Sequence, residues 1–190
     1  MIRNALILAA ALFVSASGSA LAQSQTMTSD QAEFRSLYEE LVETNTSLSS
    51  GSCTLAAERM AARLKAAGIP ESDLHLFSTP EHPKDGGLVA VYPGRDRRAK
   101  AVLMLAHLDV VEAKREDWTR DPFTLVEENG YFYGRGVIDD KAMASVWVDT
   151  LMRFKREGFR PKRTLKLALS CGEEGGPLTA RTTLPGTGAN

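Results

Sequence analysis

The feature that most constrains the fold is a pair of apolar runs, each followed by polar side chains that can do chemistry. Residues 101–106 read AVLMLA and lead directly into His107, while residues 164–170 read TLKLALS and precede Glu173 and Glu174. A continuous apolar run is typical of a strand that is covered on both faces. In open α/β sheets, ligands bind beyond the carboxyl ends of the strands. If the two strands run parallel, the histidine and the glutamates reach the same edge of one sheet.

The rest of the pattern predicts an α/β fold. Apolar residues recur with helical spacing in three segments, at about 29–44, 54–67 and 141–157. Further strands are expected at 74–77 and 88–92, and as a hairpin of 123–127 and 131–133 around the Asn129-Gly130 pair. This order of elements predicts a mixed, mostly parallel sheet with helices on both faces.

A third group of acids belongs to the same edge. Asp139 and Asp140 stand at the start of the helix that precedes the last predicted strand. Each piece has a structural alternative, because an Asp at this place can cap a helix and a His after a strand is often only hydrogen-bonded. Adjacent carboxylates repel each other, however, unless a cation neutralises them. Imidazole combined with carboxylates, without a set of cysteines, favours a zinc-type hydrolytic site.

Several ordered motifs resemble one family. They are HLDVV at 107–111, Trp118 followed by DPF at 121–123, NGYFYGRG at 129–136, IDDK at 138–141 and GEE at 172–174. Together they resemble the N-terminal part of the catalytic domain of the M20 metallopeptidases, of the carboxypeptidase S-like or M20/M25/M40 type. The resemblance runs from about Glu33 to Glu174, and we assign residues 29–174 to the partial catalytic domain. It implies an enzyme that hydrolyses an amide bond of a small peptide or an N-acyl amino acid.

The resemblance also implies residue roles. His107 would ligate one zinc ion, Glu174 would ligate the other, and Asp139 would bridge the two. Asp109 would orient the imidazole, and Glu173 would be the general base that takes a proton from the attacking water. No role is implied for Asp140, and no other cofactor is expected.

The family pattern continues beyond GEE with another acidic ligand, a smaller domain used for dimerisation, and a final His ligand. We expect the chain to be truncated and to lack the dimerisation domain, with loss of activity as the consequence. Residues 175–190 are rich in Gly, Thr and Pro, and a one-base shift of their reading frame can encode a segment similar to the family's next helix. We therefore expect an aberrant tail that arises from a frameshift near Gly175.

The N-terminus predicts export. Arg3 precedes an apolar stretch at 5–14, and Ala20-Leu21-Ala22 has the small-x-small pattern of a cleavage site. We expect a signal peptide at 1–22, a flexible leader at 23–28 and a periplasmic or secreted protein. The apolar stretch is shorter than the roughly 20 residues that span a bilayer, so no membrane association is expected after cleavage.

The two cysteines leave alternatives open. Cys53 and Cys171 could pair in an exported protein, but their spacing along the chain does not decide this. Because Cys171 ends an apolar run, a buried thiol is the favoured interpretation.

Composition excludes other classes. The formal net charge is −1 and no basic stripe occurs, so nucleic acid is not an expected partner. Gly134-Arg135-Gly136 lacks the spacing of a dinucleotide-binding loop, and no G-x-S-x-G of a serine hydrolase occurs. The remaining alternative is an exported α/β binding domain that reuses the fold without catalysis.

Overall fold

The computed structural model describes residues 27–175. The predicted signal peptide, residues 23–26 of the predicted leader and residues 176–190 of the predicted tail lie outside this range. Within it, no helix is long and apolar enough to cross a membrane. The described chain contains three α-helices and six strands, with two short 3₁₀ turns. Their bounds are α1 Ser29–Glu43, α2 Cys53–Ala66, β1 Leu74–Thr79, β2 His82–Tyr92, β3 Val102–His107, β4 Val126–Glu128, β5 Tyr131–Tyr133, α3 Lys141–Arg156 and β6 Leu165–Ser170.

Four strands form a mixed sheet in the order β1-β2-β6-β3. The pairs β1–β2 and β2–β6 are antiparallel, and β6–β3 is parallel. The predicted α/β fold with a mixed sheet is confirmed. The expectation of a mostly parallel sheet is wrong for the described residues, because the β1–β2 hairpin adds two antiparallel pairings that short apolar runs cannot reveal.

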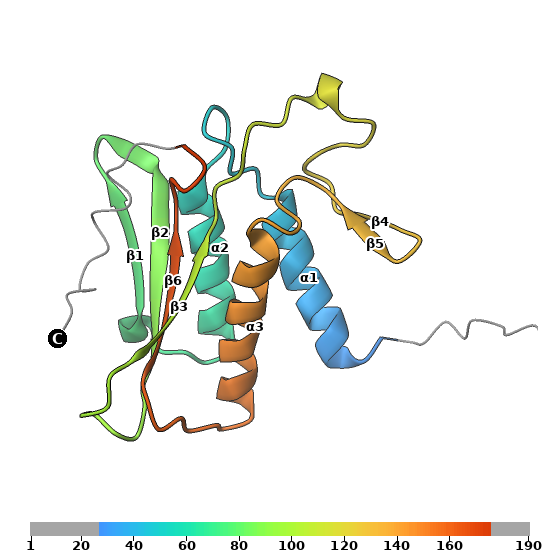
Figure 1. The fold of residues 1–190 in the computed structure, drawn as a ribbon. Coiled ribbons are helices and arrows are strands. Elements are labelled where there is room, and N and C mark those ends of the chain that lie inside the picture. Colours follow the sequence, from blue (N-terminus) through green and yellow to red (C-terminus); the bar gives the residue numbers. More distant parts are fainter. Residues whose placement is uncertain (1–26, 176–190) are drawn as a thin grey trace, which may run out of the picture.

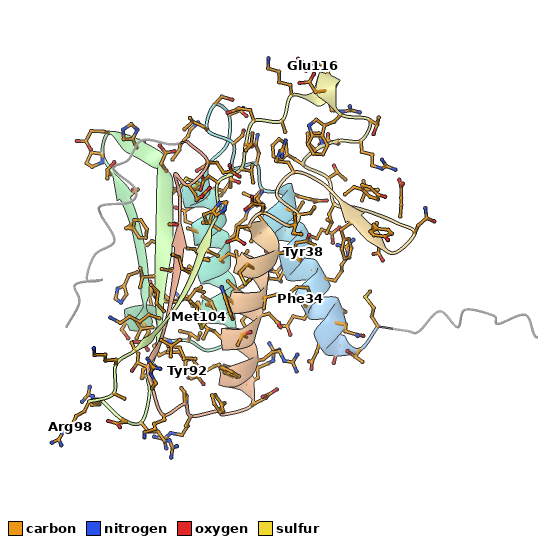
Figure 2. All side chains as sticks on the ribbon, viewed as in Figure 1. Phe34, Tyr38, Tyr92, Arg98, Met104 and Glu116 are labelled. Atoms are coloured by element: carbon orange, nitrogen blue, oxygen red, sulfur yellow. A yellow bond between two sulfur atoms is a disulfide. The ribbon has the colours of Figure 1, made fainter. Side chains whose placement is uncertain are left out.

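The helices lie on one side of this sheet (Figure 1). Their apolar faces and the facing side of the sheet form one core, in which Met104 of β3 lies on the helical side (Figure 2). Helices on both faces were expected, and the described residues show only one covered face. Strand β3 is accordingly not covered on both faces as predicted, since it is an edge strand on which Leu103 and Leu105 are 54% and 53% exposed.

Helix α1 packs against α3 and begins with the cap that its sequence favours. The Thr28 hydroxyl accepts from the Gln31 N–H, and the Gln31 side chain accepts from the Thr28 N–H. Tyr38 of α1 contacts the β4–β5 hairpin, with its ring 5.5 Å from that of Phe132 (Figure 2). The Tyr38 hydroxyl also donates to the Val137 carbonyl. Helix α1 is therefore fixed to the segment that leads into Asp139.

Candidate metal centre

The parallel pairing of β3 with β6 brings the predicted site together. His107, the last residue of β3, is in register with Ser170, the last residue of β6. The segments that follow both strands therefore leave the sheet at one edge, as the sequence predicts. The N-terminus of α3 reaches the same edge, because α3 runs along β3 and precedes β6 in the chain (Figure 1).

The two ring nitrogens of His107 face different partners. Nδ1 lies 3.1 Å from the carbonyl oxygen of Asp109 and 3.6 Å from its Oδ1. Nε2 lies 3.0 Å from Oδ1 of Asp139 and 4.0 Å from Oε2 of Glu173. With Nδ1–H directed at Asp109, the neutral ring presents the lone pair of Nε2 to the acids of the edge.

The surrounding acids strongly favour the protonated ring in the metal-free chain. The Asp109 side chain that faces Nδ1 raises the pKa of His107 to about 9, against the opposing effect of burial. Asp139 acts in the same direction. A group of anions that holds a proton this tightly is also suited to holding a cation.

Asp109 is buried beneath the imidazole. Burial alone would raise its pKa, but hydrogen bonding to His107 and to the backbone of Glu174 and Glu173 outweighs burial, so its pKa lies below the usual value. Its Oδ2 accepts from the Glu174 N–H at 2.8 Å. Its Oδ1 is buried and has no hydrogen-bond partner. Asp109 thus links the histidine to the loop that carries the glutamates, which is the place predicted for an orienting carboxylate.

The two aspartates before α3 differ in position. The side chain of Asp139 is exposed, and its Oδ1 faces Nε2 of His107. Asp140 occupies the N-cap position of α3 without a side-chain capping bond. Its Oδ2 instead accepts from the backbone N–H of His107 at 3.3 Å, and burial raises its pKa. The peptide bond between the two residues is cis. Asp140, to which no role was assigned, therefore attaches the start of α3 to the end of β3.

The glutamates of the GEE motif complete the cluster. One donor atom each from His107, Asp139 and Glu174 lie within 4.8 Å of one another. Burial raises the pKa of Glu174, and the negative charge of Asp139 adds to this effect. Glu173 is about half exposed beside the cluster. The structure thus brings together all five predicted site residues, and their roles stay predictions.

Residues 103–189 match the model of peptidase family M20/M25/M40. Over these residues the chain is similar to this family. The matched region contains every predicted site residue. Curated relatives include N-fatty-acyl-amino acid synthase/hydrolase PM20D1 of Xenopus tropicalis, 37% identical over 81 residues, and human aminoacylase-1, 34% identical over 89 residues. The Beta-Ala-Xaa dipeptidase of Lactobacillus delbrueckii subsp. lactis is 40% identical over 76 residues.

These alignments cover 43%, 46% and 40% of this chain, and 16%, 22% and 16% of the respective relatives. The chain therefore spans about a fifth or less of the length of these proteins. Among solved structures, human carnosine dipeptidase 1 superposes with a TM-score of 0.63 at 23% identity, covering 77% of this chain and 33% of that one. The M20 metallo-carboxypeptidase Sso-CP2 of Sulfolobus solfataricus gives 0.63 at 20% identity, covering 78% and 32%. At these identities the two structures show that the fold is shared.

The donor atoms of the cluster have the chemistry that suits a metal ion. A catalytic zinc ion takes three protein ligands from imidazole and carboxylate groups and leaves a fourth position open. His107, Asp139 and Glu174 supply such a set within the described residues, and Asp109 supplies the hydrogen-bond acceptor that a ligating imidazole needs at its other nitrogen.

The two cysteines of the chain are paired. Cys53 and Cys171 form a disulfide with an S–S distance of 2.05 Å. The favoured interpretation of Cys171 as a buried thiol is wrong, although both residues are buried. The bond joins the first residue of α2 to the start of the Gly172–Glu174 loop. Two cysteines 118 positions apart gave no signal of this proximity in the sequence.

Lys141 is a second residue whose place the sequence does not predict. As the first residue of α3 it is fully buried, and its Nζ donates to the carbonyls of Val42 and Thr44 at 3.3 and 2.8 Å. These carbonyls belong to the end of α1, where backbone oxygens lack helical partners. Burial lowers the pKa of Lys141 to about 7. The lysine thus connects the end of α1 to the residues that follow Asp139.

Proposed function

We propose that the chain carries the catalytic part of an exported, zinc-dependent amidohydrolase that acts on small peptides or N-acyl amino acids. The observation that carries this proposal is the cluster of His107, Asp139 and Glu174 with Glu173 at its side. The relatives are named as an N-fatty-acyl-amino acid synthase/hydrolase, an aminoacylase and a dipeptidase, and these names support a substrate with an amide bond to an amino acid.

The proposed role of each site residue follows from its position. His107, Asp139 and Glu174 would hold zinc, which when bound supplies a Lewis acid for the scissile carbonyl and lowers the pKa of a water molecule. Glu173 is exposed, lies 4.0 Å from Nε2 of His107 and contributes no donor to the cluster. It is therefore free to accept the proton of the attacking water and to pass it to the leaving nitrogen. Asp109 keeps the imidazole in one orientation.

Three donors in the described residues would hold one zinc ion, and a second ion bridged by Asp139 stays a prediction. Export to the periplasm or beyond is likewise part of the proposal, on the basis of the N-terminal sequence pattern. A disulfide between two buried cysteines is consistent with an oxidising compartment.

The test uses the full chain loaded with zinc and assayed with dipeptides and N-acyl amino acids. The proposal expects slow turnover that Glu173→Gln abolishes while zinc affinity stays within about twofold, because a base is lost and no ligand is lost. His107→Ala should lose both zinc and turnover. Glu116→Gln, an exposed glutamate in the loop after β3, is the matched control and should change neither (Figure 2).

Two outcomes would contradict the proposed function. Zinc binding without any turnover would contradict the hydrolytic proposal and would favour the binding-domain alternative. Zinc affinity that is unchanged in His107→Ala would contradict the proposed centre itself.

A further inference from the structure

A second group of potential metal ligands lies directly beneath the first. Donor atoms of Cys53, Asp109 and Cys171 lie within 4.8 Å of one another, and all three residues are buried. In the oxidised chain the two sulfurs are bonded to each other and their capacity to bind metal is low. The carboxylate of Asp109 also faces His107 of the first cluster.

Two further observations point to a ligand at this place. Oδ1 of Asp109 is buried, lies 3.6 Å from Nδ1 of His107 and has no hydrogen-bond partner, so it can accept a further ligand. In addition, a cavity of about 140 Å³ is lined by both cysteines and Asp109, together with Asp85, Gly172 and Glu174. This space is large enough to let the sulfurs separate and to admit an ion with a water molecule.

We propose that reduction of the Cys53–Cys171 disulfide creates a binding site for one thiophilic divalent cation, such as zinc or cadmium, formed by the two cysteine sulfurs and the Asp109 carboxylate. A dithiol supplies the two electrons and two protons that convert the disulfide to two thiols, and is itself oxidised to a disulfide. Binding of the cation then releases the two thiol protons to solvent.

The geometry suits this chemistry. Zinc–sulfur bonds of about 2.3 Å in a tetrahedral site place two thiolate sulfurs less than 5 Å apart, and a carboxylate oxygen binds at about 2.0–2.2 Å. The Asp109 carboxylate already lies within 4.8 Å of both sulfurs, and the bonded sulfurs must move apart once the disulfide is reduced. Two thiolates select zinc or cadmium over magnesium or calcium. The cavity leaves the fourth position to water.

The cysteine site uses neither His107 nor either glutamate, so it can be tested separately from the proposed hydrolytic function. The two sites are coupled all the same, since both use Asp109. A cation held by the sulfurs would draw the Asp109 charge away from the imidazole. The reduced chain would then bind metal at the sulfurs at the expense of the His107 cluster.

The experiment measures cadmium binding by the ultraviolet charge-transfer absorption of cadmium–thiolate bonds, to which imidazole and carboxylate ligands do not contribute. The full chain is reduced with a dithiol without oxygen, separated from the reductant by gel filtration, and titrated with cadmium. The expected result is an absorption change that saturates at one ion per chain and is absent from the oxidised chain. Near-ultraviolet circular dichroism checks that the reduced chain keeps its fold.

Three variants locate the ion. Cys53→Ser should abolish the saturable signal, and Asp109→Asn, which keeps both thiols, should weaken cadmium binding roughly tenfold or more. His107→Ala should retain the signal, so failure of the hydrolytic proposal cannot be mistaken for failure of this one. Loss of the fold on reduction, or a reduced folded chain without one-to-one charge-transfer binding, would overturn the proposal. An unchanged affinity in Asp109→Asn would overturn the part assigned to the carboxylate.

Discussion

Nε2 of His107 lies 3.0 Å from Oδ1 of Asp139, although the two residues are 32 positions apart in the chain. In the absence of metal this contact joins a protonated ring to a carboxylate, because the acids around His107 raise its pKa to about 9. A zinc ion requires the same nitrogen and the same oxygen. A proton and a zinc ion therefore compete for Nε2 of His107, which makes the zinc affinity of the cluster depend on pH.

Zinc affinity should rise with pH. Below the metal-free pKa of about 9, each unit of pH should increase the affinity by about tenfold, because one proton leaves His107 when zinc binds. Above that pKa the dependence should level off. Competition with a chromophoric chelator at a series of pH values measures this slope. His75→Ala, which alters an exposed histidine of β1, should leave it unchanged, and a flat profile in the wild type would contradict the assignment of His107 as a ligand.

Asp109→Asn should weaken zinc binding by roughly 10–100-fold without removing a ligand, because the ring loses the charged acceptor that faces Nδ1. The amide can still accept from the Glu174 N–H, so the loop contact is largely preserved. The same substitution should lower the pKa of His107 in the metal-free chain, which histidine NMR titration measures. Asp117→Asn, in the exposed turn Arg115–Asp117, is the matched control. Equal zinc affinities of the Asp109 and Asp117 variants would refute the orienting role.

The sequence allowed the convergence of His107, Asp139 and Glu174 to be predicted because it depends on local patterns. Two apolar runs mark the strands, and parallel strands end at one edge of a sheet. The ordered motifs supplied the family. The antiparallel pairings and the exposed face of β3 could not be predicted, since an apolar run does not reveal what packs on each side.

Contacts between distant segments were the second kind of miss. The Cys53–Cys171 bond and the burial of Lys141 depend on the relative placement of helices and strands. A lysine at the start of a helix is ordinarily solvated, and no local pattern marks this one as buried. The sequence left open whether the aspartates cap the helix. Asp140 occupies the N-cap position, but its side chain bonds the His107 N–H in place of its own helix.

Lys141 should give the metal-free chain a stability that rises with pH. Its pKa is about 7 in the folded chain and about 10.5 when unfolded, so between these values the unfolded state binds more protons and the free energy of unfolding increases with pH. His107 acts oppositely, because its folded pKa of about 9 exceeds the unfolded value of 6.5 and its contribution is lost as pH rises through 9.

The two contributions separate by substitution. By denaturant unfolding in the presence of a chelator, the free energy of unfolding of wild type minus that of Lys141→Met should grow between about pH 7 and 10.5, by an amount on the order of a few kcal/mol. Lys162→Met removes an exposed lysine and should leave the profile intact. Parallel profiles for wild type and Lys141→Met would mean that the buried amine does not titrate in this range.

The uncovered face of β3 should make the chain self-associate. Leu103 and Leu105 are more than half exposed on an edge strand, whose free backbone groups can pair with another chain. Replacing Leu103 by Glu puts a negative charge beside Lys166, its register partner on β6, and replacing Leu105 by Lys puts a positive charge two positions along the same face. The double variant should therefore keep the sheet and remain monomeric at concentrations where wild type associates, as sedimentation velocity can measure. Val146→Glu, which charges an exposed apolar site on α3 away from the sheet edge, should associate as wild type does. If that helix variant were the one to become monomeric, association would run through α3, and the edge of β3 would have no part in it.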